Sequence, residues 1–173
     1  MCIRDSRLIA ERLTGTPQDG FVSQAMAHGS ATEPEARAAY EFYKNCNVEE
    51  LAFAPHPTIA GSHASPDGLV GEDGLTEFKC CATATHIDLL LGAGTPEKYI
   101  IQCQWQMAVT GRKWNDLTYF DPRMPEEMRL HIRRIHRDDT HIAELEDAAR
   151  EFLSELNEKL QRLRQVVGMR EAA

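Results

Sequence analysis

The sequence has no long hydrophobic run and no segment typical of export. Its longest apolar run, residues 87–91, is interrupted by Asp88 and is far too short to cross a bilayer. The first six residues lack the basic and then apolar character of a signal peptide. These absences predict a protein that works in the cytoplasm without a membrane partner.

Closely spaced cysteine pairs are also absent. The five cysteines stand at positions 2, 46, 80, 81 and 103 and form no CxxC pair. Reduced cytosolic thiols explain this odd, scattered set better than disulfides or a zinc site do. The net charge of −8 argues against a protein that coats DNA passively. It leaves room for a nuclease, because a metal neutralises an acidic site and basic residues can gather on one face.

With 173 residues the chain has the length of one domain, and we expect a single nuclease domain over residues 1–173. Its first 25 residues are atypical, and the abrupt start suggests a truncated reading frame with a few foreign residues at its head. The segment Arg7–Gly15 predicts a short amphipathic helix that Gly15 ends. Residues 26–165 then hold the expected core and C-terminal helix.

The order of periodic segments predicts an α/β (α+β) fold with a central mixed sheet flanked by helices. A helix is expected from Thr32, as its cap, to Lys44, with Asn45 as its stop. A final helix is expected after a cap at Asp139 or Thr140. Further helices are predicted at 83–91 and 96–110, and further strands at 48–53, 58–64, 117–120 and 130–135.

One stretch carries most of the chemical information. Two short strands, 68–70 and 75–81, are joined by an acidic, Gly-rich turn that is typical of a hairpin. The hairpin brings Asp67 back beside Glu77. Because side chains alternate along a strand, Glu77 and Lys79 share a face. Two carboxylates and an amine are therefore expected to converge.

This trio matches the PD-(D/E)xK arrangement of nucleases, with Pro66 before Asp67 and then Glu77-x-Lys79. Mg²⁺ is usually held by one or two carboxylates, waters and substrate phosphate. A nearby ammonium aligns the attacking water or offsets developing charge. The alternative is a surface hairpin with one Glu–Lys pair, since such a pattern also arises by chance.

Polar residues outside the hairpin are weaker candidates. Glu33, in the first turn of its helix, is either a surface acid or a site residue. On the helix 96–110, Tyr99, Gln102 and Gln106 share a face, and Gln104 adds a third amide. Neutral amides suit a site that touches phosphate, although an exposed polar face explains them as well. The basic candidates for a DNA path are Arg112, Lys113, Arg123, Arg133 and Arg134.

Four separated motifs resemble the phage lambda exonuclease, or YqaJ-type viral recombinase, family. They are residues 65–69, residues 75–80, Gln102-x-Gln104 with Val109-Thr110, and residues 119–124, in the same order over about residues 26–165. The resemblance implies a restriction-endonuclease-like core that digests duplex DNA 5′→3′ with Mg²⁺, or Mn²⁺ in its place, and releases mononucleotides. It also implies a homotrimer, a single-strand annealing protein as partner, and a phage or prophage gene expressed in a bacterial cytoplasm.

The resemblance also implies roles for single residues. Asp67, Glu77 and the helix-borne Glu33 would bind metal, Lys79 would position the water, and Gln102 and Tyr99 would lie beside the site. We expect DNA contacts from Gln104, Arg112 and Arg123. The family binds the 5′ phosphate through an N-terminal arginine and serine, for which Ser6 and Arg7 are the remaining match. The chain also departs from the family at Cys81, where a proline is common.

Three alternatives stay open at this point. A RecB-type nuclease with an iron–sulfur cluster would need four suitably placed cysteines, which are missing. A catalytically impaired or truncated relative would serve as a DNA-binding or assembly subunit, but it would have no reason to keep Asp67, Glu77 and Lys79 together. A metal-free α/β domain would show no thermal stabilisation by Mg²⁺ or Mn²⁺.

Overall fold

The computed structural model describes residues 3–17 and 24–166, with side chains for residues 6–17 and 27–166. The chain divides into two units, which are Val22–Leu145 and the combination of Met1–Phe21 with Glu146–Ala173. Each unit is described by itself below. The expectation of one nuclease domain over the whole chain stays a prediction.

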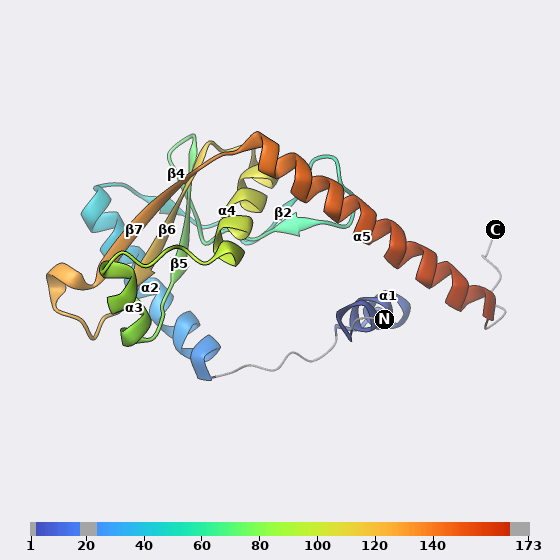
Figure 1. Ribbon diagram of the computed structural model, residues 1–173, viewed down its shortest axis with the longest axis horizontal. Coiled ribbons are helices and arrows are strands. Elements are labelled where there is room, and N and C mark those ends of the chain that lie inside the picture. Colours follow the sequence, from blue (N-terminus) through green and yellow to red (C-terminus); the bar gives the residue numbers. More distant parts are fainter. Residues whose placement is uncertain (1–2, 18–23, 167–173) are drawn as a thin grey trace. The chain divides into compact units, whose positions relative to one another are not determined.

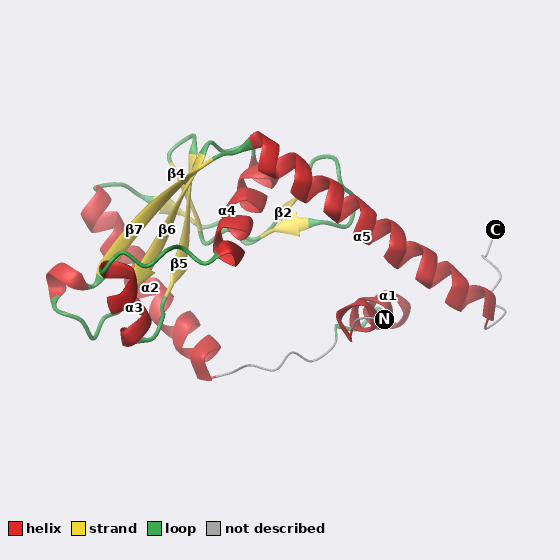
Figure 2. Cartoon of the chain, viewed as in Figure 1, coloured by secondary structure: helices red, strands yellow, loops and turns green. Residues whose placement is uncertain are grey.

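The larger unit is built on a five-stranded sheet (Figures 1 and 2). Its strand order is β1-β4-β5-β6-β7, and only β5 and β6 run parallel. The predicted central mixed sheet is thus confirmed. The strands are β1 (Val48–Glu49), β4 (Gly68–Val70), β5 (Gly74–Lys79), β6 (Trp114–Phe120) and β7 (Leu130–His136), and the short 3₁₀ helix η1 (Glu126–Met128) precedes β7.

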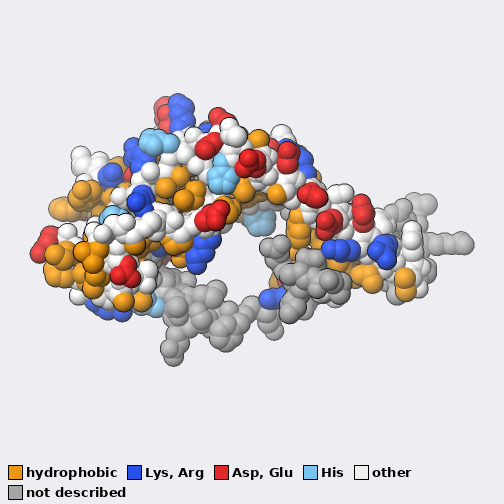
Figure 3. Space-filling model, in the orientation of Figure 1, with side chains coloured by type: hydrophobic (Ala, Val, Ile, Leu, Met, Phe, Trp, Pro, Cys, Tyr) orange, Lys and Arg blue, Asp and Glu red, His pale blue; other side chains and the backbone are white. Residues whose placement is uncertain are grey.

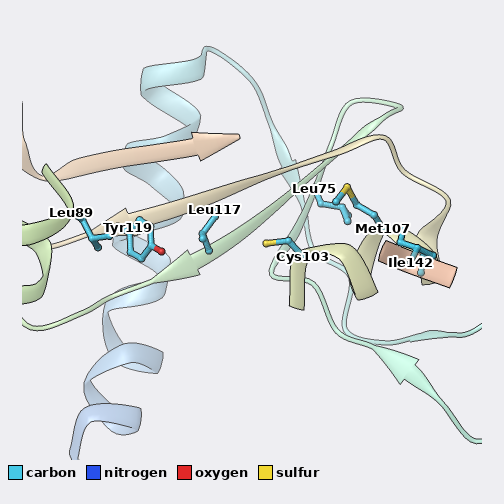
Figure 4. Close-up of a cluster of buried hydrophobic side chains, with 8 residues drawn as sticks. Leu75, Leu89, Cys103, Met107, Leu117, Tyr119 and Ile142 are labelled. Carbon is cyan, nitrogen blue, oxygen red and sulfur yellow. The ribbon is translucent and has the colours of Figure 1, made fainter. Parts of the chain in front are cut away.

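The parallel pair requires a crossover, and two helices supply it. They are α3 (Thr83–Leu90) and α4 (Glu97–Thr110), as the sequence predicted within one or two residues. Gly111 ends α4 in a left-handed conformation with φ 72°. Cys103 and Met107 of α4 pack against Leu75 and Leu117 of the sheet (Figure 4), so α4 is held over this face.

The opposite face of the sheet is covered by α2 (Gln24–Lys44), whose Ala36 and Tyr40 pack against Phe78 and Phe120. The helix ends at Asn45, with φ 48°, as expected. The predicted Thr32 cap is wrong, because the helix starts earlier in an Ala-rich stretch. The Thr32 hydroxyl instead donates a hydrogen bond of 2.8 Å to the His28 carbonyl oxygen, one turn back in the helix.

The strands expected at 48–53 and 58–64 are much shorter than predicted. Only β1, β2 (Ala54–Pro55) and β3 (His63–Ala64) form, and β2 pairs with β3 in a separate two-stranded sheet. Between them, the buried His56 ring accepts the backbone N–H groups of Thr58 and Ile59, each at 3.2 Å. This side chain turns the chain and ends the extended conformation.

The smaller unit pairs α1 (Ile3–Thr14) with the second half of α5 (Asp139–Val166). Ile9 packs there with Leu156 and Leu160, which confirms both amphipathic helices. Acidic side chains predominate along most of the visible face of α5, and basic side chains gather toward its C-terminal end (Figure 3). At its start, Asp138 accepts the N–H groups of Thr140 and His141, so the cap lies one residue before the predicted Asp139.

Two further expectations concern the whole chain. The cysteines with described side chains, at 46, 80, 81 and 103, are all free thiols, whereas Cys2 lies outside the described residues. Among the described helices, none combines the length and hydrophobicity that a membrane crossing requires.

Gly68, next to Asp67, is packed too closely to accept a side chain. A Cβ there would collide with the Cγ1 atom of Val48 on β1. Gly68→Ala is therefore expected to lower the free energy of unfolding by about 1–3 kcal/mol in urea titrations. Gly29→Ala is the control: nothing lies within 4 Å of its Cβ position in α2, and it should stabilise by about 0.5–1 kcal/mol. Equal effects would contradict the packing described.

Candidate active site

The β4–β5 hairpin brings the two predicted carboxylates together. Gly68 pairs with Thr76, so the next residues outward, Asp67 and Glu77, lie opposite one another. The Asp67 Oδ2 atom accepts the backbone N–H of Phe78 at 2.7 Å. The hairpin geometry predicted from the turn residues is confirmed.

Glu77 is the centre of the cluster, and its side chain is almost fully buried. Its Oε1 atom accepts hydrogen bonds from Lys79 Nζ and Gln102 Nε2, both at 2.5 Å. Its Oε2 atom accepts one from Gln106 Nε2 at 2.6 Å. Lys79 comes from the same strand, whereas both glutamines come from α4. The predicted Glu77, Lys79 and Gln102 therefore meet.

The surroundings raise the pKa of both Asp67 and Lys79, for different reasons. Burial, followed by the charge of Glu77, raises the pKa of Asp67 from 3.8 to about 7. Burial alone would lower the pKa of Lys79, but the charge and hydrogen bond of Glu77 outweigh it and raise that pKa. Lys79 therefore stays an ammonium, while Asp67 holds a proton up to neutral pH when no cation lies beside it.

A second buried aspartate, Asp116, shows the opposite behaviour on the other face of the sheet. It accepts hydrogen bonds from Arg134 Nε and Nη2, at 2.7 and 2.8 Å, and from the Tyr40 hydroxyl at 2.8 Å. Burial raises its pKa, but these hydrogen bonds outweigh burial and lower the pKa below 3.8. Asp116 is thus neutralised by Arg134, whereas no arginine among the described residues forms an ion pair with Asp67.

Glu33 reaches the same region from α2. Glu33, Asp67, Arg37 and Glu50 line a cavity of about 280 Å³. Arg37 lies 3.6 Å from Glu33, 2.5 Å from Glu50, and 3.2 Å from the carbonyl oxygen of Asp67. The structure therefore brings Glu33 to the Asp67 side of the site, as the resemblance implied.

The donor set suits a hard cation that keeps much of its own water. Within the described part of the chain, no three His, Cys, Asp or Glu side chains form a ready-made metal cluster. Asp67 has one carboxylate oxygen without a partner among the described residues, and no Lys or Arg there forms an ion pair with it. A buried carboxylate pair with an uncompensated charge fits Mg²⁺, which is commonly held by one or two carboxylates plus waters and substrate.

Tyr99 lies at the edge of this cluster. Its ring is 5.0 Å from Lys79 Nζ and 4.8 Å from Lys98 Nζ. It also makes an edge-to-face contact with Tyr119 at 6.4 Å. The structure thus places Tyr99 beside Lys79, where the resemblance expected it to line the site.

Three of the residues predicted to bind DNA have structural partners instead. Gln104 is buried, donates to the His136 carbonyl at 2.8 Å and accepts the Asp138 N–H at 3.0 Å. Arg112 holds the hairpin turn through the carbonyl oxygens of residues 71 and 74, and Arg123 pairs with Asp121. For Gln104 these bonds leave no amide group for DNA. For Arg112 and Arg123, DNA contact stays a prediction.

The remaining basic candidates also have partners within the protein. Lys113 pairs with Asp73, Arg133 donates to Thr95, and Arg134 donates to Asp116. Ser6 and Arg7 lie on α1 in the smaller unit. Their suggested role in binding the terminal phosphate therefore stays a prediction.

Four residues of the site were given no role there by the sequence, although Gln106 was already noted on the face that it shares with Gln102. Arg37 and Glu50 line the cavity beside Asp67, and Gln106 and Asn115 lie behind Glu77. For Gln106 a signal existed, because it follows Gln102 by one helical turn. For the other three, nothing in the local sequence pointed to the site.

Known proteins resemble this chain in sequence and in fold. Residues 6–113 match the family model described as YqaJ-like viral recombinase domain. The alkaline exonuclease LHK-Exo from Laribacter hongkongensis is 44% identical, with 95% of this chain and 84% of that chain covered and a TM-score of 0.88. Its complex with dAMP gives a TM-score of 0.89. No curated protein matches the chain.

A more distant structure shares the fold alone. The phage related exonuclease from Haemophilus somnus 129PT is 14% identical, with 91% of this chain and 82% of that chain covered and a TM-score of 0.69. At this identity the likeness concerns the arrangement of the sheet and helices.

Proposed function

Because this chain belongs to the YqaJ-like viral recombinase domain family, we propose that it is a Mg²⁺-dependent exonuclease that hydrolyses phosphodiester bonds at the ends of duplex DNA. The observation that carries the proposal is the convergence of Asp67, Glu77 and Lys79 at the open end of the β4–β5 hairpin. The 44% identity to an alkaline exonuclease supports the same reaction class.

In this proposal the carboxylates bind the metal, and the Lys79 ammonium positions the attacking water. Asp67 and Glu77 would bind one Mg²⁺, and Glu33 would bind a second one beside Asp67. When bound, the metal polarises the scissile phosphate and makes a water more acidic. Lys79, as a permanent ammonium, donates hydrogen bonds to the attacking water and offsets charge on the phosphate, but it does not take up a proton.

The expected direction of digestion is 5′→3′, with mononucleotides as products. The resemblance to phage-type enzymes supports the direction. The relative that was solved with dAMP supports a mononucleotide product, because dAMP has the chemistry of one released unit. Contacts to the sugar–phosphate backbone carry no sequence code, so we expect activity on any sequence and a loss of activity at high salt.

The second candidate function is a non-catalytic subunit that binds DNA or assists assembly. It would keep the fold but not the chemistry. The complete set of carboxylates, ammonium and amide donors around Glu77 favours the enzyme instead.

Assembly and partners belong to the same proposal. The resemblance supports a homotrimer around DNA, a single-strand annealing protein as partner, and a place in a bacterial cytoplasm. Light scattering after gel filtration checks the first of these, with an expected mass of about three chains of 19.5 kDa each.

The test uses linear duplex DNA labelled at either the 5′ or the 3′ end. With Mg²⁺ we expect early release of the 5′ label as a mononucleotide, and no release with EDTA or with Glu77→Ala. Early loss of the 3′ label would reverse the proposed direction. A folded protein that binds duplex DNA yet releases neither label would support the non-catalytic alternative.

A further inference from the structure

Two amide side chains form a buried relay behind Glu77. Gln106 Nε2 donates to Glu77 Oε2 at 2.6 Å, and Gln106 Oε1 accepts from Asn115 Nδ2 at 2.6 Å. Glu77, Gln106 and Asn115 are 3%, 2% and 0% exposed. The relay therefore links β5, α4 and β6 through atoms that solvent does not reach.

The relay has a fixed direction. An amide donates from its nitrogen and accepts at its oxygen, whereas an ionised carboxylate only accepts. Gln106 therefore turns its nitrogen toward Glu77 and its oxygen toward Asn115. Asn115 in turn presents its N–H group to that oxygen and so holds Gln106 in this orientation. If Gln106 turned over, its oxygen would face the Glu77 oxygen and its nitrogen would face the Asn115 nitrogen.

The contact with Gln106 accounts for the asparagine. The Oδ1 atom of Asn115 is buried and has no hydrogen-bond partner among the described protein groups, so this end of the amide costs stability. An apolar side chain at this position of β6 would remove that cost but would leave the buried oxygen of Gln106 without its donor. The bond that Asn115 makes is therefore directed at Gln106.

We propose that Gln106 and Asn115 are positioning residues that orient the Glu77 carboxylate for binding the catalytic divalent cation. The inference deepens the proposed nuclease function and rests on it. Gln106 fixes one Glu77 oxygen, while Lys79 and Gln102 share the other, so the carboxylate cannot rotate. Asn115 acts only through Gln106. Residues that orient a ligand in this way typically change metal affinity 10- to 100-fold.

The same helix offers a matched control. Gln104 is also a buried glutamine with both ends of its amide bonded, but it joins the backbone of His136 and Asp138, outside the site. Gln104→Met and Gln106→Met each replace one buried amide of α4 by an apolar side chain of similar length. Both should lower stability, and only Gln106→Met should change the metal site.

The experiment measures Mn²⁺ binding by calorimetry, with no DNA present, and the Mg²⁺ concentration that half-activates cleavage. Gln106→Met is expected to weaken Mn²⁺ binding by about 10- to 100-fold and to raise the Mg²⁺ requirement similarly, with most of kcat recovered at saturating Mg²⁺. Gln104→Met should stay within about twofold of wild type on both measures. Asn115→Leu should resemble Gln106→Met, and the double variant should be no worse than Gln106→Met alone.

Three results would contradict the proposal in different ways. If Gln106→Met binds Mn²⁺ as tightly as Gln104→Met does, the relay has no positioning role. If the losses of Gln106→Met and Asn115→Leu add, Asn115 does not act through Gln106. A wild type that neither binds Mn²⁺ nor cleaves DNA would overturn the nuclease function itself and the relay with it. Should Gln106→Met not fold, Asn115→Ser takes its place in the comparison.

Discussion

Replacing Lys79 by alanine is expected to slow DNA cleavage by roughly 100- to 1000-fold. The ammonium is the only cation bonded to Glu77 among the described residues, and its raised pKa keeps it charged over the working range. Its loss removes the donor that would align the water and leaves the Glu77 charge uncompensated. The measurement is kcat on linear duplex DNA at saturating Mg²⁺.

Lys98 provides the matched control for this variant. Both ammonium groups lie near the Tyr99 ring, at 5.0 Å for Lys79 and 4.8 Å for Lys98, but Lys98 is exposed. Lys98→Ala should change kcat by less than about threefold, because exposed charges contribute little. If Lys79→Ala keeps more than a tenth of the wild-type kcat, or if the two variants behave alike, the role given to Lys79 is wrong.

Stabilisation by Mg²⁺ is expected to be about twice as large at pH 8.5 as at pH 6, at one Mg²⁺ concentration. The pKa of Asp67 is about 7 in the metal-free protein, so below pH 7 a proton competes with the cation. The apparent affinity should then fall by up to about tenfold for each pH unit. With Mg²⁺ at about 100 times its Kd, we expect Tm to rise by roughly 5–10 °C at pH 8.5. Differential scanning fluorimetry with and without Mg²⁺ measures this.

The same carboxylate sets the pH dependence of the metal-free protein. Because folding raises the pKa of Asp67, its contribution to stability is complete below about pH 4 and is lost as the pH rises through 7. Asp67→Asn should therefore have a higher Tm than wild type at pH 8.5 without metal, and it should not respond to Mg²⁺. An equal Mg²⁺ response at pH 6 and pH 8.5 would contradict the part given to Asp67.

The carboxylate pair was predictable because its geometry is local. A Gly-rich turn fixes the hairpin register, and the register alone places Asp67 opposite Glu77. Glu33 was different, since its approach to Asp67 depends on how α2 packs against the sheet, and only the family resemblance indicated it. Local sequence therefore determined two of the three acids that are proposed to bind metal.

The amides show where sequence patterns stop being informative. Helical spacing put Gln102 and Gln106 on one face, and both do donate to Glu77. Gln104, two residues from each, lies on the other side of α4 and bonds to the backbone near His136. Asn115 could not be found at all, because its contact with Gln106 exists only after α4 has docked on β6.

The predicted secondary structure failed where side chains replaced backbone partners. A threonine followed by a proline in the first turn and a glutamate three residues on predicts a helix cap at Thr32, yet Thr32 bonds backward to His28 inside a longer helix. The strands expected on either side of His56 are cut short by its imidazole, which accepts two backbone N–H groups. Such local bonds depend on burial that a sequence pattern does not contain.

The crossover between β5 and β6 has a consequence for synthesis on the ribosome. The chain emerges from its N-terminus, so Asp67, Glu77 and Lys79 appear together, whereas Gln102, Gln106 and Asn115 follow 25 or more residues after Glu77. A nascent chain would therefore hold the acids before it holds the groups that orient them. Under the proposed function, an unfinished chain carries the whole acidic motif without being able to cut DNA.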